Sequence, residues 1–331
     1  MTQILVTGGA GYIGSHAVKR LLADGHNVAV LDNLSRGHRS AVPQEARFYQ
    51  TDLAETEAIT HILRENAIEV VMHFAAFAAV GESMAQPLLY YQNNTAGAVS
   101  LLTAMQRCGV ARLIFSSTAA TFGIPDEMPI VETTRQEPVN PYGWSKWMVE
   151  RALLDLVRAN PQFGFTALRY FNVAGSAADG SIGEDHDPET HLIPNIIRAA
   201  LGRSGAIQIF GTDYPTPDGT CIRDYVHVED LIDAHVRSMN ALRDGDKRFY
   251  NLGIGRGYSV REMIAATEEV LGVPIPVQEG PRRAGDPPVL FTSSEKIQRE
   301  LGWKPAYTEA QSMIATAWNW LKNHPNGYGD S

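Results

Sequence analysis

A tyrosine and a lysine stand four residues apart in the segment Tyr142-Gly143-Trp144-Ser145-Lys146. On a helix this spacing puts both side chains on one face, about one turn from each other. A nearby ammonium favours the phenolate form of a tyrosine, and a second positive charge would bring its pKa, ordinarily about 10, toward neutrality. The pair therefore predicts that Tyr142 is a general base that accepts a proton from a substrate hydroxyl.

Three hydroxyl residues, Ser116, Ser117 and Thr118, directly follow the apolar run at 113–115. They come at the carboxyl end of a predicted strand, which is where open α/β sheets bind their ligands. A hydroxyl at this position can relay a proton. Taken alone, both patterns are also typical of commoner features, an exposed Tyr–Lys pair and a Ser/Thr turn.

Gly8, Gly11 and Gly14 recur at every third position between the apolar run at 4–6 and a predicted helix. Such a turn lets the backbone approach a pyrophosphate, which the helix N-terminus then faces. The spacing departs from the plain G-x-G-x-x-G form, because Gly9 accompanies Gly8. We interpret it as a dinucleotide-binding turn, the alternative being a purely structural one.

Asp32 ends the second apolar run, 24 residues after Gly8. A carboxylate there can accept hydrogen bonds from both ribose hydroxyls of an adenosine and would repel a 2′-phosphate. We therefore expect NAD rather than NADP. Because Arg36 lies nearby and could pair with a 2′-phosphate, use of both NAD and NADP stays open. The alternative role of Asp32 is to cap a turn.

These residues require a scaffold of parallel strands. Short β-branched runs alternate with amphipathic stretches, which predicts an α/β fold with a Rossmann-type doubly wound parallel sheet. Residues 1–170 would form the NAD-binding domain, with some later segments returning to it, and 171–331 mainly a smaller C-terminal α/β substrate-binding domain. We expect strands at 4–6, 28–31, 48–50, 70–74, 113–115 and 166–168, helices at 14–23, 55–65, 94–107, 145–159, 226–241, 260–271 and 310–322, ligand-closing loops at 175–194 and 211–219, and an edge strand at 274–277.

The bulk composition narrows the class of protein. The chain has 331 residues and a formal net charge of −9, and its basic residues form no run, which argues against nucleic acid as a partner. Two cysteines are too few for a disulfide framework or a metal-binding spacing. The sequence shows neither a signal peptide nor a membrane-spanning run, so we expect a cytoplasmic protein that does not contact a membrane, and no metal site.

Seven short motifs stand in one order and spacing along nearly the full length of the chain, at 7–16, 32–35, 80–83, 140–143, 169–172, 183–184 and 223–227. Together they resemble the extended short-chain dehydrogenase/reductase family, in its UDP-sugar 4-epimerase branch. The resemblance implies that Tyr142 is the base, Lys146 its electrostatic partner and Thr118 the hydroxyl that shares the proton. It also implies a homodimer built on the helices at 94–107 and 145–159.

The same resemblance implies two sets of binding residues. The cofactor set is Gly8, Gly11, Tyr12, Ile13, Gly14, Asp32, Asn33, Ser35, Asp52, Leu53, Phe74, Ala75, Ala76, Asn94, Ser116, Tyr142, Lys146 and Phe171. The set for the UDP-sugar is Thr118, Asn172, Arg223, Arg283, Asp286 and Leu290.

The activity that the resemblance implies is reversible epimerisation at C4 of a UDP-sugar, through a transient 4-keto sugar and with NAD restored in every turnover. UDP-glucose and UDP-galactose are the expected pair. Leu290 stands where relatives carry a bulky tyrosine, so UDP-GlcNAc and UDP-GalNAc should also fit, and Ala78 replaces a lysine of some relatives, which predicts looser NAD binding.

Three alternatives stay open. A UDP-xylose/UDP-arabinose 4-epimerase would use the same machinery. A sugar-nucleotide dehydratase or decarboxylase shares the oxidation step, but dehydratases need an Asp-Glu pair after Thr118, where this chain has Ala119 and Ala120. A non-catalytic NAD-binding sensor would be expected to lack Thr118, Tyr142 and Lys146.

Overall fold

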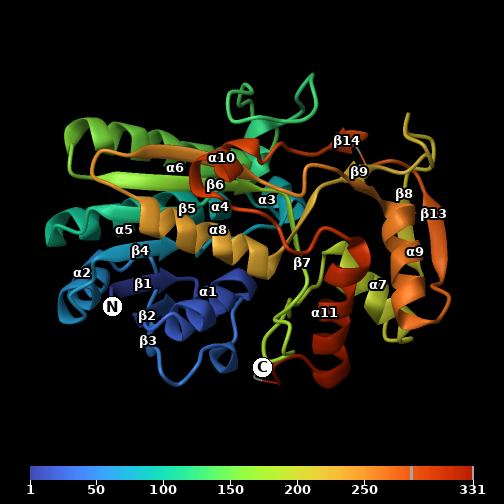
Figure 1. Ribbon diagram of the computed structural model, residues 1–331, viewed down its shortest axis with the longest axis horizontal. Coiled ribbons are helices and arrows are strands. Elements are labelled where there is room, and N and C mark those ends of the chain that lie inside the picture. Colours follow the sequence, from blue (N-terminus) through green and yellow to red (C-terminus); the bar gives the residue numbers. More distant parts are fainter. Residues whose placement is uncertain (284–285, 330–331) are drawn as a thin grey trace.

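A seven-stranded parallel sheet forms the centre of the computed structural model, which describes residues 1–283 and 286–329 (Figure 1). Its strands stand in the order β11-β6-β5-β4-β1-β2-β3. Strand β6 is buried along all seven residues and β4 along all four, as expected of strands covered on both faces. The predicted doubly wound sheet is confirmed, with β1 (Gln3–Thr7), β2 (Asn27–Asp32), β3 (Arg47–Gln50), β4 (Val70–His73), β5 (Arg112–Ser116), β6 (Gly164–Tyr170) and β11 (Lys247–Leu252).

Two layers of helices cover this sheet, because the side chains of a strand alternate between its faces. Ile4 and Val6 of β1 belong to one apolar core, which α1 (Tyr12–Ala23), α8 (Val228–Ala241) and α10 (Glu295–Leu301) complete. Leu5 belongs to the opposite core, which α2 (Thr56–Glu65), α5 (Gly97–Cys108) and α6 (Pro141–Ala159) complete. The short α3 (Val80–Ala85), α4 (Pro87–Tyr90) and a π-helical turn (Tyr91–Ala96) lead into α5.

A smaller group of elements lies beside the sheet, at the right of Figure 1. Its own apolar core is formed by α7 (Leu192–Ala200), α9 (Val260–Leu271), α11 (Ala310–Asn323) and β8 (Ile207–Phe210). The more exposed strand β13 (Val277–Gly280) pairs in parallel with β8. Short strands connect the two parts: β7 (Asn172–Ala174) with β10 (Tyr225–His227), and β9 (Ile222–Arg223) with β12 (Tyr258–Ser259) and β14 (Val289–Leu290). The assignment of the two parts to cofactor and substrate stays a prediction.

Several boundaries differ from the sequence expectation: α6 begins at Pro141 instead of 145, and residues 226–227, expected in a helix, belong to β10. Two further differences have a clear physical reason. Helix α7 begins at Leu192, inside the segment 175–194 that we expected to be a loop. Pro194 is tolerated there because the first turn of a helix has no intrahelical acceptor for its N–H groups. The strand expected at 274–277 begins only at Val277, because Pro276 lacks an N–H and contributes only its carbonyl, which accepts from Ile207 N at 2.8 Å.

Two short 3₁₀ turns, Arg39–Ala41 and Ala119–Phe122, complete the secondary structure of the described residues. Within residues 1–283 and 286–329, none of the helices combines the length and the apolar character needed to cross a membrane.

Candidate active site

A cleft of about 490 Å³ lies at the carboxyl ends of β1, β2, β4, β5 and β6. This is the edge at which doubly wound sheets bind their ligands. A second chamber, of about 440 Å³, shares Asn172, His191, Arg223 and Asp286 with the cleft. The two spaces together form one elongated site between the sheet and the smaller part of the molecule.

The glycine turn forms one wall of the cleft. Gly8 has a φ of +72°, and a Cβ at this position would lie 2.5 Å from the backbone nitrogen of Ala75. A Cβ on Gly14 would overlap the carbonyl oxygen of Gly8. Gly11 is the N-cap of α1, and none of the side chains that the structure describes caps the helix. The turn therefore presents free amide groups and a positive helix end to an anion, which fits a pyrophosphate.

The carboxylate of Asp32 lies beyond this turn and is 7% exposed. It accepts hydrogen bonds from Ala10 N at 3.0 Å and from Leu34 N at 2.9 Å. Burial raises its pKa, and the two backbone hydrogen bonds act in the opposite direction. Arg36, which had left the use of NADP open, forms an ion pair with Glu82 at 2.6 Å. The Asp32 carboxylate is thus held in place to bind the ribose of an adenosine. The Arg36 guanidinium already has a partner, so it is not free to bind a 2′-phosphate.

Tyr142 and Lys146 lie on α6, across the cleft from the glycine turn. Asn140 caps this helix by accepting from Gly143 N at 2.8 Å, and Pro141 occupies its first position. This start places Tyr142 in the first turn and Lys146 one turn later. The Lys146 ammonium donates to the carbonyl oxygen of Ser116, at the end of β5, at 2.8 Å.

The pKa values in this group depend mainly on burial. Burial raises the pKa of Tyr142, while a hydrogen bond with the Thr118 side chain acts in the opposite direction. Burial also lowers the pKa of Lys146 to about 7. Burial is the largest influence on the pKa of Tyr142 in the protein alone, and the lowering expected with bound NAD stays a prediction.

A buried ion pair holds α6 against the sheet. The Glu150 carboxylate lies one turn beyond Lys146 and accepts from Arg169 Nε at 2.9 Å and from Arg169 Nη2 at 2.7 Å. Both side chains are almost fully buried, at 2% and 4% exposure. Ser117 Oγ and Gln136 Nε2 donate to the same carboxylate at 2.6 and 2.9 Å. These bonds fix the distance between α6 and the strand ends that carry the hydroxyl groups.

Arginines lie at the far end of the site. Arg223 forms an ion pair with Asp286 and donates to the carbonyl oxygen of Pro287 at 2.7 Å. Arg283 lines the second chamber, with its guanidinium carbon 3.9 Å from the centre of the Phe210 ring. A protein with a negative net charge has no general positive field to attract a phosphorylated ligand. Individual arginines such as these can bind its phosphate groups instead.

Nearly all the residues that we had singled out line this site. Arg283 borders only the second chamber, whereas Asn94 lies behind the wall, 2% exposed, where its side chain bonds to both backbone groups of Phe77 and to Ser145 Oγ. The cleft is lined by Gly8, Gly11, Tyr12, Ile13, Gly14, Asp32, Asn33, Ser35, Asp52, Leu53, Phe74, Ala75, Ala76, Ser116, Thr118, Tyr142, Lys146, Phe171, Asn172, Arg223, Asp286 and Leu290.

Among the further residues that line the cleft are Tyr170, Glu184, His186 and His191, none of which had been named as a binding residue. Tyr170 could have been predicted as a lining residue, because it is the last residue of β6 and so lies at the carboxyl edge of the sheet. The other three come from the loop before α7, where the alternation of Glu and His in 184–191 was a usable indication.

Known proteins resemble this chain over nearly its full length. A family model described as the NAD dependent epimerase/dehydratase family matches residues 4–253. A UDP-glucose 4-epimerase of Lacticaseibacillus casei is 52% identical over 330 residues, which cover 99% of both chains. A crystal structure of a UDP-glucose 4-epimerase, 49% identical, superposes with a TM-score of 0.95 and covers 98% of this chain and 99% of its own.

A third relative was solved with ligands. It is the UDP-glucose 4-epimerase from Stenotrophomonas maltophila with bound NAD and formylated UDP-arabinopyranose, 40% identical, with a TM-score of 0.94 and coverage of 98% and 99% of the two chains. The family model, the identity and the shared architecture all agree with the motifs found along the sequence. The chain belongs to the NAD dependent epimerase/dehydratase family.

Proposed function

We propose that this protein interconverts UDP-glucose and UDP-galactose by reversible epimerisation at C4, with NAD held in the cleft throughout. One observation carries the proposal: Thr118, Tyr142 and Lys146 lie in the same cleft as the glycine turn, and this cleft continues into the chamber that holds Arg223. Its relatives in Lacticaseibacillus casei and Stenotrophomonas maltophila support the choice of reaction by their names.

The residues of the glycine turn fit NAD. Backbone amides at the start of α1 would hold the pyrophosphate, and Asp32 would accept the hydroxyls of the adenine ribose. Asp52 and Leu53 would border the adenine, while Lys146 would bind the nicotinamide ribose. Bound NAD supplies the acceptor and donor for the hydrogen at C4, together with a positive charge near Tyr142.

The chain itself handles the proton on the sugar hydroxyl. Tyr142 Oη would accept the proton from O4 as the hydroxyl is oxidised to a ketone, and would return it when the ketone is reduced. The Thr118 side chain, which hydrogen-bonds Tyr142, would hold the phenolic oxygen in position. Because burial raises the pKa of Tyr142 in the protein alone, this base would become active only when the site is charged by its ligands.

Inversion requires that the keto sugar turn over while the nucleotide stays in place. Arg223, Arg283 and Asn172 would hold the UDP half, and so provide the binding energy. The wall near Thr118 is mostly apolar and includes Ala119, Ile124 and Leu290, besides Phe171, which packs in the same cluster as Leu290. Apolar side chains offer the hexose few fixed hydrogen bonds, so they would allow it to rotate.

We propose a broad choice of sugar as well. Leu290 lies in the wall of the cleft where a tyrosine would narrow it, which supports turnover of UDP-GlcNAc. A pentose is the second candidate, since the Stenotrophomonas relative was crystallised with a formylated UDP-arabinopyranose. Incubation with each UDP-sugar, followed by chromatographic analysis of the products, ranks the substrates. A UDP-GlcNAc that is not converted even at high enzyme concentration would contradict the broad choice.

The Tyr142→Phe variant tests the mechanism. It keeps the ring but lacks the proton-accepting oxygen, so NAD content should stay at the wild-type level while kcat for UDP-galactose falls by about two to four orders of magnitude. Tyr49→Phe is a matched control, because Tyr49 lies on the edge strand β3 and bonds to Glu65 and Asn66. Unchanged turnover in Tyr142→Phe would refute the mechanism, whereas full NAD binding without any turnover of UDP-sugars by the wild type would favour a sensor.

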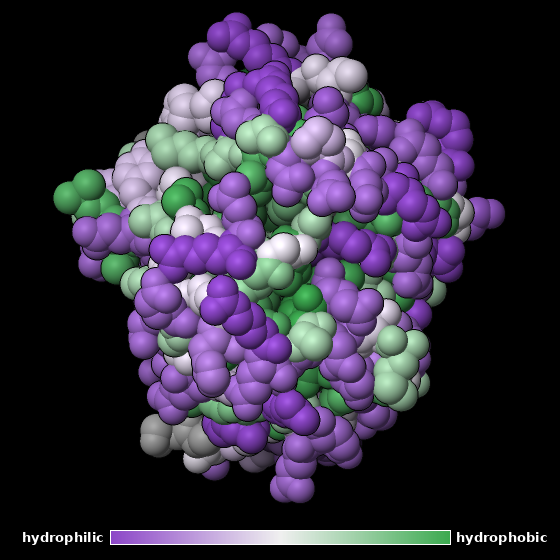
Figure 2. Space-filling view, turned by 90° about the vertical axis from the view of Figure 1, so that its left-hand side faces the viewer, coloured by the Kyte–Doolittle hydropathy of each residue, from purple (hydrophilic) through white to green (hydrophobic). Residues whose placement is uncertain are grey.

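We also propose a homodimer in the cytoplasm. Helices α5 and α6 pack side by side on one face of the sheet and expose Val99 (48%) and Met148 (40%). Figure 2 faces the end of the molecule at which α5 and α6 terminate, and it shows small apolar patches among hydrophilic residues there. Light scattering coupled to gel filtration would give the mass of one chain if this interface does not form.

A further inference from the structure

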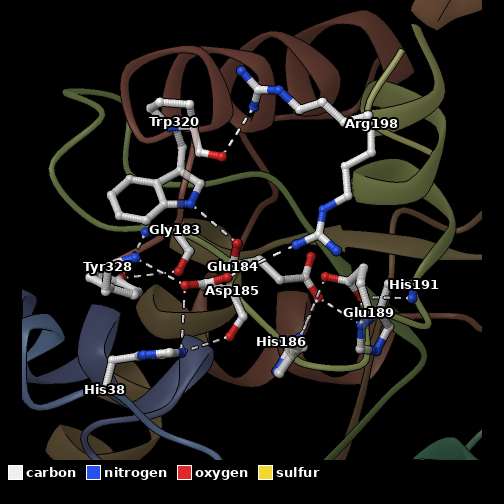
Figure 3. A network of polar contacts seen from close by, with 12 residues as sticks. His38, Gly183, Glu184, Asp185, His186, Glu189, His191, Arg198, Trp320 and Tyr328 are labelled. Atoms are coloured by element: carbon white, nitrogen blue, oxygen red, sulfur yellow. Dashed lines mark hydrogen bonds and ion pairs between the residues drawn. The ribbon is translucent and has the colours of Figure 1, made fainter. Parts of the chain in front are cut away.

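Two glutamates and two histidines converge on the wall of the cleft, outside the machinery described above (Figure 3). Glu184, His186 and Glu189 come from the loop that leads to α7, and His191 is the N-cap of that helix. Each residue offers one ligand atom, and these four atoms all lie within 4.8 Å of one another. Only the Gly183–Glu184 part of this loop belongs to the motifs singled out above, and the proposed reaction uses none of the four residues.

The spacing of these atoms fits a coordination shell. His191 Nδ1 lies 2.7 Å from Glu184 Oε1 and 3.1 Å from Glu189 Oε1. His186 Nδ1 lies 3.2 Å from Glu184 Oε1 and 3.8 Å from Glu189 Oε2. For ligands about 2.0–2.2 Å from a tetrahedral ion, the ligand atoms are roughly 3.3–3.6 Å apart. The observed distances lie on both sides of this range, so small movements of the four side chains would bring their ligand atoms into tetrahedral positions around an ion.

Hydrogen bonds account for only part of the cluster: His191 Nδ1 and Glu189 Oε1 form one at 3.1 Å, but other atoms of the cluster have none within the described part of the chain. Glu184 Oε1, His186 Nδ1 and Glu189 Oε2 are buried atoms for which no hydrogen-bond partner of acceptable geometry is found among the described residues. The Glu184 side chain is 7% exposed and that of Glu189 only 1%. Buried polar atoms are normally hydrogen-bonded, and exceptions point to a missing water or ion. Here three of them face one another across a common centre.

The surroundings hold the ligands in place. The backbone amides of Thr190 and His191 both donate to Glu189 Oε1 at 2.8 Å, which leaves Oε2 directed at the cluster. The carbonyl oxygen of Glu184 accepts from Trp320 Nε1 of α11 at 3.1 Å, as Figure 3 shows. Such outer contacts orient the first ligands of a metal ion.

We propose that Glu184, His186, Glu189 and His191 bind a divalent transition-metal ion, Zn²⁺ in the first place. Two imidazole nitrogens with two carboxylate oxygens suit such an ion, whereas Mg²⁺ and Ca²⁺ prefer oxygen ligands alone. Four protein ligands complete a tetrahedron and leave no open position, so the ion is structural. It fastens the loop at 184–191 to the start of α7, at the border of both chambers.

The test is metal content of the NAD-bound protein. Wild type is loaded with a small excess of Zn²⁺, freed of loosely bound metal by gel filtration, and analysed by mass spectrometry of the elements. We expect about one Zn²⁺ per chain, and near zero in Glu184→Gln/Glu189→Gln. The matched control, His61→Asn/Glu65→Gln, removes an exposed His–Glu pair on α2, 3.5 Å apart, and should retain zinc as wild type does.

Two further measurements keep the proposal refutable if the double variant folds poorly. Wild type loaded with Co²⁺ should show the visible absorption of a tetrahedral ion without a sulfur-to-metal charge-transfer band, and a chelator should lower its Tm. Absence of stoichiometric zinc in wild type, equal zinc in all three proteins, or a charge-transfer band from Cys108 or Cys221 would each overturn the proposal. Absence of zinc would leave the cluster as ion pairs only.

Discussion

The buried pair between Glu150 and Arg169 makes a strong prediction about stability. Glu150→Gln keeps the shape of the side chain but removes its charge, which leaves the Arg169 guanidinium, 4% exposed, without an anionic partner. Breaking a buried ion pair in this way costs about 3–5 kcal/mol. With an unfolding entropy of about 2.1 cal/mol/K per residue, a chain of 331 residues should lose roughly 4–7 °C in Tm.

Differential scanning calorimetry of the NAD-bound protein measures this loss. Glu57→Gln is the control, because Glu57 pairs with Arg107 at 2.5 Å on the surface, where it is 85% exposed, and an exposed pair contributes at most about 1 kcal/mol. Glu150→Gln/Arg169→Met should recover part of the loss, since it also removes the unpaired charge. If Glu150→Gln and Glu57→Gln shift Tm equally, the pair does not hold α6 as we have argued.

Three other predictions concern the two ends of the cleft and its lysine. Asp32→Asn should weaken NAD binding by about tenfold, the equivalent of one charge-assisted hydrogen bond of about 1.4 kcal/mol, and an unchanged NAD content after dialysis would speak against the ribose contact. Lys146→Met should abolish a pH dependence of stability. The pKa of Lys146 in the folded protein, about 7, lies below its usual value, so the unfolded chain binds more protons between about pH 7 and 10 and wild type gains stability as pH rises through this range. Denaturant titrations of Lys146→Met should show no such gain. Leu290→Tyr should reduce kcat/KM for UDP-GlcNAc more than for UDP-galactose, and an equal reduction for both would exclude Leu290 as a determinant of size.

The central sheet could be predicted from sequence because its strands are buried on both faces. Such strands consist of nearly uninterrupted apolar runs rich in β-branched residues, as at 70–72 in β4. Helix α7 could not be recognised, because Pro194 and the polar residues before it are equally typical of a loop. The start of β13 could not be predicted either, because it is set by backbone pairing with the distant residue Ile207, which the local sequence does not reveal.

The site was predictable where a function requires a particular residue type at a particular position. Gly8 and Gly14 are such residues, since any side chain there would collide with backbone. The position of Asn94 behind the wall was not predictable, because it depends on the path of the chain at Phe77. The burial of Tyr142 and Lys146 was not predictable for a related reason: spacing along α6 gives the distance between the two side chains but not the desolvation that moves both pKa values.

Strand β11 has a consequence for how the molecule can be divided. It joins the central sheet beside β6 only after the chain has passed through β7 to β10 and α7. A protein ending near Phe171 would lack β11 and α8, so β6, buried along its whole length, would become an open edge. An apolar edge strand of this kind promotes aggregation. A cut near Phe171 therefore separates the sheet from two of its own elements, so the two parts of the molecule fold as one unit and cannot be produced separately at this boundary.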